Sequence, residues 1–230
     1  PTAASIDLRL VRKKTGVVVN VPAFDPVGLR LEFNGEKREG TRPFNGTFGF
    51  SNAMEIAEPI DYDTTDIKVS AEYHKQSLYL NASYYMSTFT NNNSTLTWEN
   101  PFRTTDGTAA NAYTATYASG PAKGLIDLYP DNRYSNITFN GLLGDLPMNS
   151  RISAAAALGW MRQNAAMVPY TTNTAIKTGA VTGVAGKTVP FNAYDAASLP
   201  QTNVDAKVDT GLANVELTSR PLQNMQVKAG

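Results

Sequence analysis

The stretch DIKVSAEYHKQSLYLNASYY, residues 66–85, has the clearest alternation of apolar and polar residues in the chain. It consists of two alternating arms separated by a short polar break at Lys75–Ser77. The apolar positions are Ile67, Val69, Ala71 and Tyr73 in the first arm and Leu78, Leu80, Ala82 and Tyr84 in the second. Because successive side chains of a strand point to opposite faces, each arm has one apolar and one polar face. The stretch therefore predicts a β-hairpin.

The length of these arms fits two kinds of protein. A tilted strand needs about 9–11 residues to cross a bilayer, and each arm is of about this length. Strands of soluble sandwiches average about 5–6 residues, but longer ones occur. The hairpin alone therefore fits both a membrane barrel and half of a soluble sandwich.

The same alternation recurs along the chain. It predicts strands near residues 5–21, 27–35, 66–74, 78–86, 134–143, 150–162, 203–217 and 224–230. Between them short turns alternate with three long loops, which we expect at residues 36–65, 87–133 and 163–202. Outer-membrane barrels have this alternation, with short periplasmic turns and longer extracellular loops. The apolar parity changes after Gly211, which predicts a β-bulge there.

Composition excludes several classes of protein. No apolar run approaches the roughly 18 residues of a membrane helix. Lys plus Arg equal Asp plus Glu at 20 each, so no charge excess indicates nucleic acid. The chain has no cysteine and one histidine, His74, so it cannot form disulfides, thiolate sites or attached c-type haem. The alternation is cut at both ends, so we expect the chain to be a fragment of a longer protein.

Candidate chemical sites are sparse. Asp61, Asp63 and Asp66 form a weak candidate for a metal site, but the segment lacks the glycine and final glutamate of an EF-hand loop. Glu55 and Glu58 could act as an acid–base pair, although they lie within an expected loop. We therefore predict that the chain is not an enzyme and that it carries no cofactor of its own.

The polar strand faces hold charged, amide and tyrosine side chains. They include Arg30, Glu32, Lys68, Glu72, His74, Asn81, Tyr85, Asn136, Asn140, Asp205 and Lys207. In a barrel this face would line the lumen, and in a sandwich it would be the solvated outer face. Composition does not decide between the two.

Several ordered segments resemble the MtrB/PioB family of decahaem-associated outer-membrane proteins. They are Asn34–Arg42, Phe48–Phe50, Ser83–Phe89, Asn92–Phe102, Leu128–Asn132, Met161–Asn164 and Pro169–Asn173. The likeness covers most of residues 27–175, and its strength lies in the order and spacing of the set. Some members of the family carry a Cys-x-x-Cys motif, which this chain lacks.

The resemblance implies a transmembrane antiparallel β-barrel of the bacterial outer membrane, with about eight of its strands in this chain. Relatives enclose a periplasmic decahaem c-type cytochrome in the lumen, and a second multihaem cytochrome often lies outside. The implied partner-facing lumen residues are Arg30, Glu32, Lys68, Glu72, Asn81, Tyr85, Asn136 and Asn140. The small residues Ser153, Ala155, Ala157 and Gly159 would let such a partner approach the wall. Eight strands alone leave an interior that side chains fill, so this function requires further strands.

Two other functions fit the same pattern. A general porin or solute channel would have a water-filled lumen with a charged constriction. A β-rich surface adhesin with long binding loops would be stable without detergent. Co-purifying haem would separate the cytochrome sheath from the porin, and dependence on detergent would separate both from the adhesin.

Overall fold

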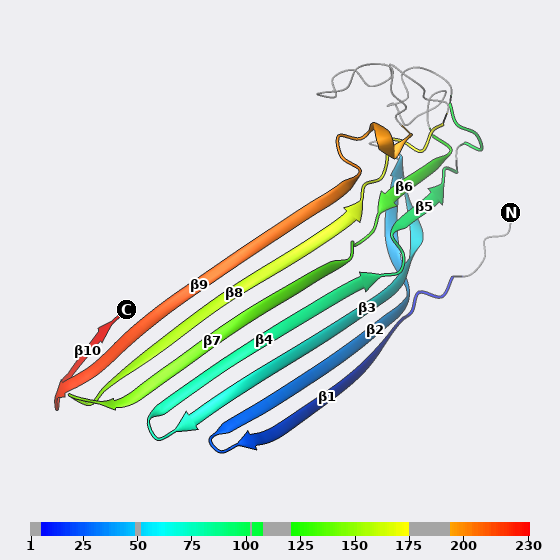
Figure 1. The fold of residues 1–230 in the computed structure, drawn as a ribbon. Coiled ribbons are helices and arrows are strands. Elements are labelled where there is room, and N and C mark those ends of the chain that lie inside the picture. Colours follow the sequence, from blue (N-terminus) through cyan, green and yellow to red (C-terminus); the bar gives the residue numbers. More distant parts are fainter. Residues whose placement is uncertain (1–5, 49–51, 102, 108–120, 175–193) are drawn as a thin grey trace.

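The predicted hairpin lies in the middle of an eight-stranded antiparallel sheet. The computed structural model describes residues 6–48, 52–101, 103–107, 121–174 and 194–230. The strands of the sheet are β1 (Leu10–Phe24), β2 (Val27–Phe48), β3 (Asn52–Lys75), β4 (Leu78–Asn91), β7 (Asn132–Leu146), β8 (Ser150–Ala166), β9 (Asn203–Leu222) and β10 (Met225–Ala229). They lie in this order across the sheet, which does not close on itself (Figure 1). The all-β antiparallel architecture is as predicted.

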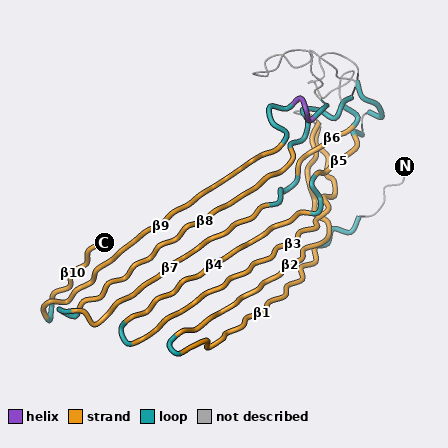
Figure 2. Tube along the Cα trace, viewed as in Figure 1, coloured by secondary structure: helices purple, strands orange, loops and turns teal. Residues whose placement is uncertain are grey.

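The remaining elements lie at one end of the sheet. A separate two-stranded sheet pairs β5 (Thr95–Glu99) with β6 (Lys123–Asp127) next to the far ends of β2 and β3 (Figures 1 and 2). The 3-10 turn η2 (Ala196–Ser198) lies at the same end. The opposite end consists of the short turns between consecutive strands. No helix among the described residues is long and apolar enough to cross a membrane.

The strands are longer than expected at the loop end. We expected a long loop at residues 36–65, but residues 36–48 continue β2 and residues 52–65 belong to β3. The two strands pair from Val27 with Tyr73 to Phe48 with Asn52, and residues 49–51 lie outside the described residues. The loop prediction was wrong because cross-strand ion pairs replace apolar alternation there. For example, Arg42 pairs with Glu58, and Lys37 with Asp63. The first strand begins at Leu10, not near residue 5.

The other two expected loops are also shorter in part. Residues 87–91 continue β4, and residues 163–166 continue β8. The segment 87–133 further contains the β5–β6 hairpin. Residues 108–120 and 175–193 of these expected loops lie outside the described residues.

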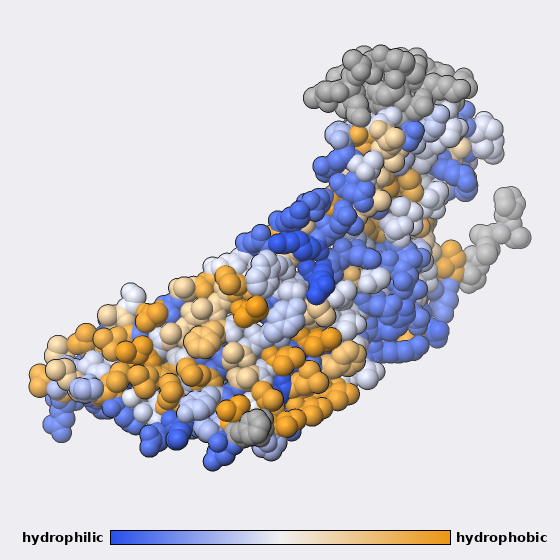
Figure 3. Space-filling view, in the orientation of Figure 1, coloured by the Kyte–Doolittle hydropathy of each residue, from blue (hydrophilic) through white to orange (hydrophobic). Residues whose placement is uncertain are grey.

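One face of the sheet carries an exposed apolar band. Directly paired residues share a face, so the register assigns every side chain. The exposed members of the band include Val17, Val19, Leu29, Leu31, Phe33, Val69, Ile137, Phe139, Ile152, Leu158, Val215 and Leu217. Such a large exposed apolar surface indicates contact with lipid or protein. Figure 3 shows it over the half of the sheet nearer the short turns, followed by a hydrophilic zone.

The band has the height of a bilayer core. On β8 it runs from Ile152 to Trp160, about 27 Å along a strand that rises about 3.4 Å per residue. A strand tilt of about 40° reduces this to roughly 20 Å, close to the apolar height of about 25 Å in outer-membrane barrels. The strands then continue past the band toward β5 and β6.

On β9 the apolar residues change face at Gly211. Leu217, Val215 and Ala213 lie on the band side, whereas Leu212 and Val208 lie on the opposite face. The β8–β9 register is continuous from Asn203 to Thr218, so the bulge predicted at Gly211 is wrong. The change of face arises in the sequence while the backbone ladder stays regular.

The buried core lies at the loop end, where β3 extends past the apolar band. The buried apolar residues among those described are Ile60, Tyr62, Leu96, Leu128 and Leu199. Ile60 and Tyr62 point to the face opposite the apolar band, where the Tyr62 ring packs against Phe89 of β4 and against Tyr129. Trp98 of β5 lies against Gly124 and Gly46, where an added Cβ would come within 2.3 and 2.8 Å of its ring.

Candidate functional site

The face opposite the apolar band holds all eight residues predicted to line the lumen, and we call it the polar wall. The register places these residues in three adjacent cross-strand rows. Glu32, Lys68, Tyr85 and Asn136 form one row, Glu72, Asn81 and Asn140 form another, and Arg30 lies in the row between them, opposite Ser70. The sequence assigned them to one face, and the structure makes them neighbours.

The charges of the polar wall compensate one another. Arg30 Nε donates to Glu32 Oε1 at 2.8 Å, and Lys68 Nζ lies 3.9 Å from the same oxygen. In the row of Glu72, Asn81 Nδ2 donates to Glu72 Oε1 at 3.2 Å. These side chains remain partly exposed, so each can still bind water or a partner.

Toward the loop end, the polar wall contains a cluster of charged side chains that sequence reasoning missed. Glu36 accepts a hydrogen bond of 2.5 Å from Arg12 Nε and one of 3.1 Å from Arg38 Nη2, and Lys14 Nζ lies 3.4 Å away. The hydrogen bond from Arg12 is the main cause that lowers the pKa of Glu36 to about 2, with Arg38 and Lys14 adding to it. Alternation extended past residue 35 could have placed Glu36 and Arg38 on one face, whereas Arg12 and Lys14 join them through the register of β1 with β2.

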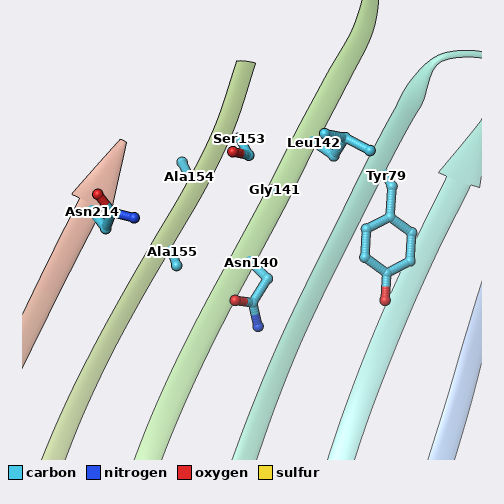
Figure 4. Close-up of a pocket in the computed structure, with 8 residues that line it drawn as sticks. All are labelled: Tyr79, Asn140, Gly141, Leu142, Ser153, Ala154, Ala155 and Asn214. Carbon is cyan, nitrogen blue, oxygen red and sulfur yellow. The ribbon is translucent and has the colours of Figure 1, made fainter. Parts of the chain in front are cut away.

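The side chains of the polar wall change from mainly charged ones on β2 and β3 to mainly amides and small ones on β7–β9. Its β7–β9 part carries Asn136, Asn140 and Asn214 together with Ala155, Ala157 and Gly159. The small side chains leave a shallow hollow of about 230 Å³, bordered by Tyr79, Asn140, Ser153, Ala155 and Asn214 (Figure 4). At Gly159 the Thr210 and Tyr134 side chains occupy the space, since a Cβ would lie 2.6 and 3.2 Å from their oxygens.

A second hollow lies at the other side of the wall, near the short turns. It has a volume of about 360 Å³ and is bordered by Asn20, Pro22, Gly28, Arg30 and Glu72. Both hollows are open and shallow, so they suit contact with a large surface better than enclosure of a small molecule.

A buried ion pair connects β2 and β3 at the loop end of the polar wall. Glu58 is completely buried and accepts hydrogen bonds of 2.7 and 2.9 Å from Arg42 and one of 3.4 Å from Tyr62. The Arg42 guanidinium also lies 5.4 Å from the centre of the Tyr129 ring. Burial is the main cause that raises the pKa of Tyr62. Glu58 thus has a structural partner, and Glu55 lies on the other face, so the two do not form an acid–base pair.

The three aspartates considered for a metal do not converge. Lys37 Nζ donates to Asp61 and, at 2.8 Å, to Asp63, and Asn92 donates to both. The hydrogen bond from Lys37 is the main cause that lowers the pKa of Asp61. Asp66 lies on the opposite face and accepts from Tyr85 at 2.9 Å. No group of three or more acidic or histidine side chains in the described part of the chain could hold a metal ion.

Three other candidate residues are placed by the register. Asp205 and Lys207 were expected on the polar wall, but they pair with Asn164 and Arg162 and lie on the face of the apolar band. They were misassigned because the apolar parity of β9 changes while its register does not. His74 pairs with Tyr79 on the polar wall beside the turn, with ring centres 6.3 Å apart.

Comparison with known proteins gives one matching family and one related sequence. A family model described as "Putative outer membrane beta-barrel porin, MtrB/PioB" matches residues 1–230. The chain is 24% identical over 223 residues to a protein named outer membrane protein MtrB from Shewanella baltica (strain OS185). The aligned region covers 97% of this chain and 27% of that relative, so the chain spans about a quarter of its length.

These findings agree with the exposed apolar band and with the open antiparallel sheet. The family is one of outer-membrane porins and is not a class of enzymes. Outer-membrane localisation follows from the same match. The chain belongs to the MtrB/PioB family of outer-membrane β-barrel proteins.

Proposed function

We propose that this chain forms part of an outer-membrane barrel that holds a periplasmic decahaem c-type cytochrome in its lumen. The barrel carries electrons across the membrane only through that partner, and an extracellular multihaem cytochrome takes or gives them outside. The chain itself supplies no haem-binding cysteine. Lipid surrounds the apolar band, and the polar wall faces the cytochrome.

The observation that carries the proposal is the composition of the polar wall. It combines charges of both signs, amides and tyrosines with a stretch of small side chains on β8. A protein surface presents mixed polar groups, and wet interfaces with complementary charge suit it. Arg30 and Lys68 are already paired with Glu32 within the wall, so an approaching protein does not meet these three as isolated charges.

The wall is open enough to admit a partner only if the barrel is larger than this sheet. The eight strands do not close, and β1 and β10 each pair on one side within the described residues. Unpaired backbone groups are very costly in lipid, so the functional barrel must pair both edges. Further strands would widen the lumen beyond the filled interior of an eight-stranded barrel.

A water-filled porin is the second candidate, since the family is described as one of porins. The row that contains Glu32, Lys68 and Tyr85 would then contribute to a charged constriction. In this case the lumen would conduct ions and hold no protein.

Purification of the complete tagged protein from native outer membranes tests the two. The sheath predicts c-type haem absorbance that remains with the barrel through gel filtration. Absence of haem together with single-channel conductance in planar bilayers would reject the sheath and favour the porin.

A pair of variants then tests the wall itself. Lys68→Glu with Arg30→Glu reverses two cations of the polar wall and should lower the haem-to-barrel ratio. Lys13→Glu is the matched control, because Lys13 lies on the other face of the sheet. An unchanged haem-to-barrel ratio in the wall variant would show that Lys68 and Arg30 do not contact the cytochrome.

A further inference from the structure

Three cations lie side by side on the face of the apolar band, and we call them the cation row. Arg133 of β7 pairs directly with Arg162 of β8, and Arg162 pairs directly with Lys207 of β9. Directly opposed side chains have Cβ atoms about 4.5–5.5 Å apart, and like charges at such positions are destabilising. Three of them in consecutive strands need negative charge nearby.

The protein supplies only part of that charge. Arg162 Nη2 lies 2.6 Å from Asp209 Oδ1, and Lys207 Nζ lies 2.6 Å from Asp205 Oδ2. Among the described residues no carboxylate lies within 4.0 Å of the Arg133 guanidinium. Three cations and two carboxylates leave one positive charge without a paired anion.

The row lies where the apolar band ends. Along β8 the band-side residues run Leu158, Trp160, Arg162, so the row begins about 7 Å beyond Trp160 at about 3.4 Å per residue. Tryptophan is enriched where membrane meets water, which places the row at the level of lipid headgroups. Figure 3 shows the hydrophilic zone that follows the apolar surface on the same face.

We propose that the cation row binds the phosphate groups of the phosphorylated glycolipid in the outer leaflet. Arginine binds phosphate through two parallel hydrogen bonds, and lysine contributes a point charge. The acyl chains of the same lipid would lie on Ile137 and Leu158, which are 47% and 55% exposed. These two residues pair with each other one row below Trp160, about 14 Å along the strands from the cation row. One molecule thus satisfies both the charge and the apolar surface, which a soluble anion does not.

The leaflet follows from the orientation of the strands. Outer-membrane barrels place their short turns in the periplasm, and the row lies at the other end of the strands. The proposal requires the outer-membrane barrel but not a cytochrome in its lumen, so the haem content of the purified protein does not affect it.

Native mass spectrometry of the complete protein in detergent tests the proposal. The probes are diphosphoryl lipid A, its monophosphoryl form and inorganic phosphate. The wild type should retain diphosphoryl lipid A most strongly, and Arg133→Gln with Lys207→Gln should weaken retention about tenfold, since each basic residue adds to attraction by anionic lipid. Asp209→Asn frees Arg162 and should strengthen retention.

The matched control removes two cations from the other face. Arg151→Gln with Lys228→Gln alters side chains of the polar wall near the short turns and should leave lipid retention unchanged. Heat-modifiable mobility on gels verifies that each variant is a folded barrel. Equal retention by the wild type and the row variant would overturn the proposal. So would an equal loss in the control, or retention of inorganic phosphate as strong as that of the lipid.

Discussion

Arg42 and Glu58 occupy directly paired positions of β2 and β3, and the guanidinium donates two hydrogen bonds to a carboxylate that is completely buried. The pair lies beyond the apolar band, in the part of the hairpin where loop composition is strongest. It ties the two strands together and provides the surface on which Tyr62 and Tyr129 pack.

Arg42→Ala should destabilise the loop end of the β2–β3 hairpin. It leaves the Glu58 carboxylate buried without its cation, and such losses cost about 3–5 kcal/mol in fully buried pairs. Because the Arg42 side chain is 36% exposed, we expect about 2–3 kcal/mol. Amide hydrogen exchange over residues 53–62 should therefore accelerate by roughly 30- to 150-fold.

The control for this variant is Arg9→Ala, since the Arg9 side chain is 73% exposed. The double variant Arg42→Met with Glu58→Leu removes both charges and should recover part of the protection. Equal exchange in the wild type and Arg42→Ala would show that the pair does not stabilise the hairpin.

The Glu36 cluster should make stability depend on pH in acid. The folded-state pKa of Glu36 is about 2, below its ordinary value of 4.5, mainly because of the hydrogen bond from Arg12. A lowered carboxyl pKa contributes stability that is complete above the ordinary value and is lost as pH falls through the folded value. The difference in Tm between wild type and Glu36→Gln should thus be constant above pH 4.5 and shrink toward pH 2.

Glu55→Gln serves as the comparison for that titration, because Glu55 is exposed and lies on the other face of β3. Its Tm difference from the wild type should be small at every pH. A Glu36→Gln difference that persists undiminished at pH 2 would contradict the assignment.

A side chain at Gly124 should disrupt the packing of the β5–β6 hairpin. A Cβ there would lie 2.3 Å from the Trp98 ring, so Gly124→Ala must displace the indole. Overpacking of this kind costs about 1–3 kcal/mol. We expect faster proteolysis of the hairpin and a red shift of tryptophan emission. Gly28→Ala is the control, since nothing lies within 4 Å of its added Cβ.

Substitution by arginine should have different effects at two residues of β9. Val215 and Leu212 are each 61% exposed, but Val215 lies in the apolar band and Leu212 on the polar wall. Arginine facing lipid costs about 2–4 kcal/mol near the bilayer midplane. Val215→Arg should therefore reduce the amount of folded barrel in outer membranes, whereas Leu212→Arg should not. Equal yields would mean that the two faces are assigned the wrong way round.

The parts of the fold that alternation controls could be predicted from the sequence. The hairpin at 66–85 and its neighbours have one apolar and one polar position at every step, so their faces were clear. The extension of β2 and β3 over residues 36–48 and 52–65 was missed because charged residues such as Lys37, Arg42 and Glu58 form ion pairs there. Such charged residues resemble the composition of a loop. The face on which Asp205 and Lys207 lie follows only from the pairing of β9 with β8, and the sequence of β9 alone does not give that pairing.

The candidate site divides in the same way. The eight wall residues could be assigned to one face, but the contact of Glu36 with Arg12 depends on which residues of β1 lie beside β2. The cation row likewise joins three strands that are separated by a turn and by the segment between residues 166 and 203. Pairing between strands brings the Glu36 cluster and the cation row together, and this pairing cannot be predicted from composition.

The change of face along β9 also fixes the height of the strand in the membrane. In a wall with uniform alternation, a slip of two residues keeps every side chain on its original face and could go unnoticed. Here the same slip toward the short turns would move Asp209 down to the level of Leu158 and immerse its carboxylate in hydrocarbon. The change from apolar to charged residues along the band side of β9 therefore fixes its register against β8. It excludes the two-residue register shifts that alternation alone would allow.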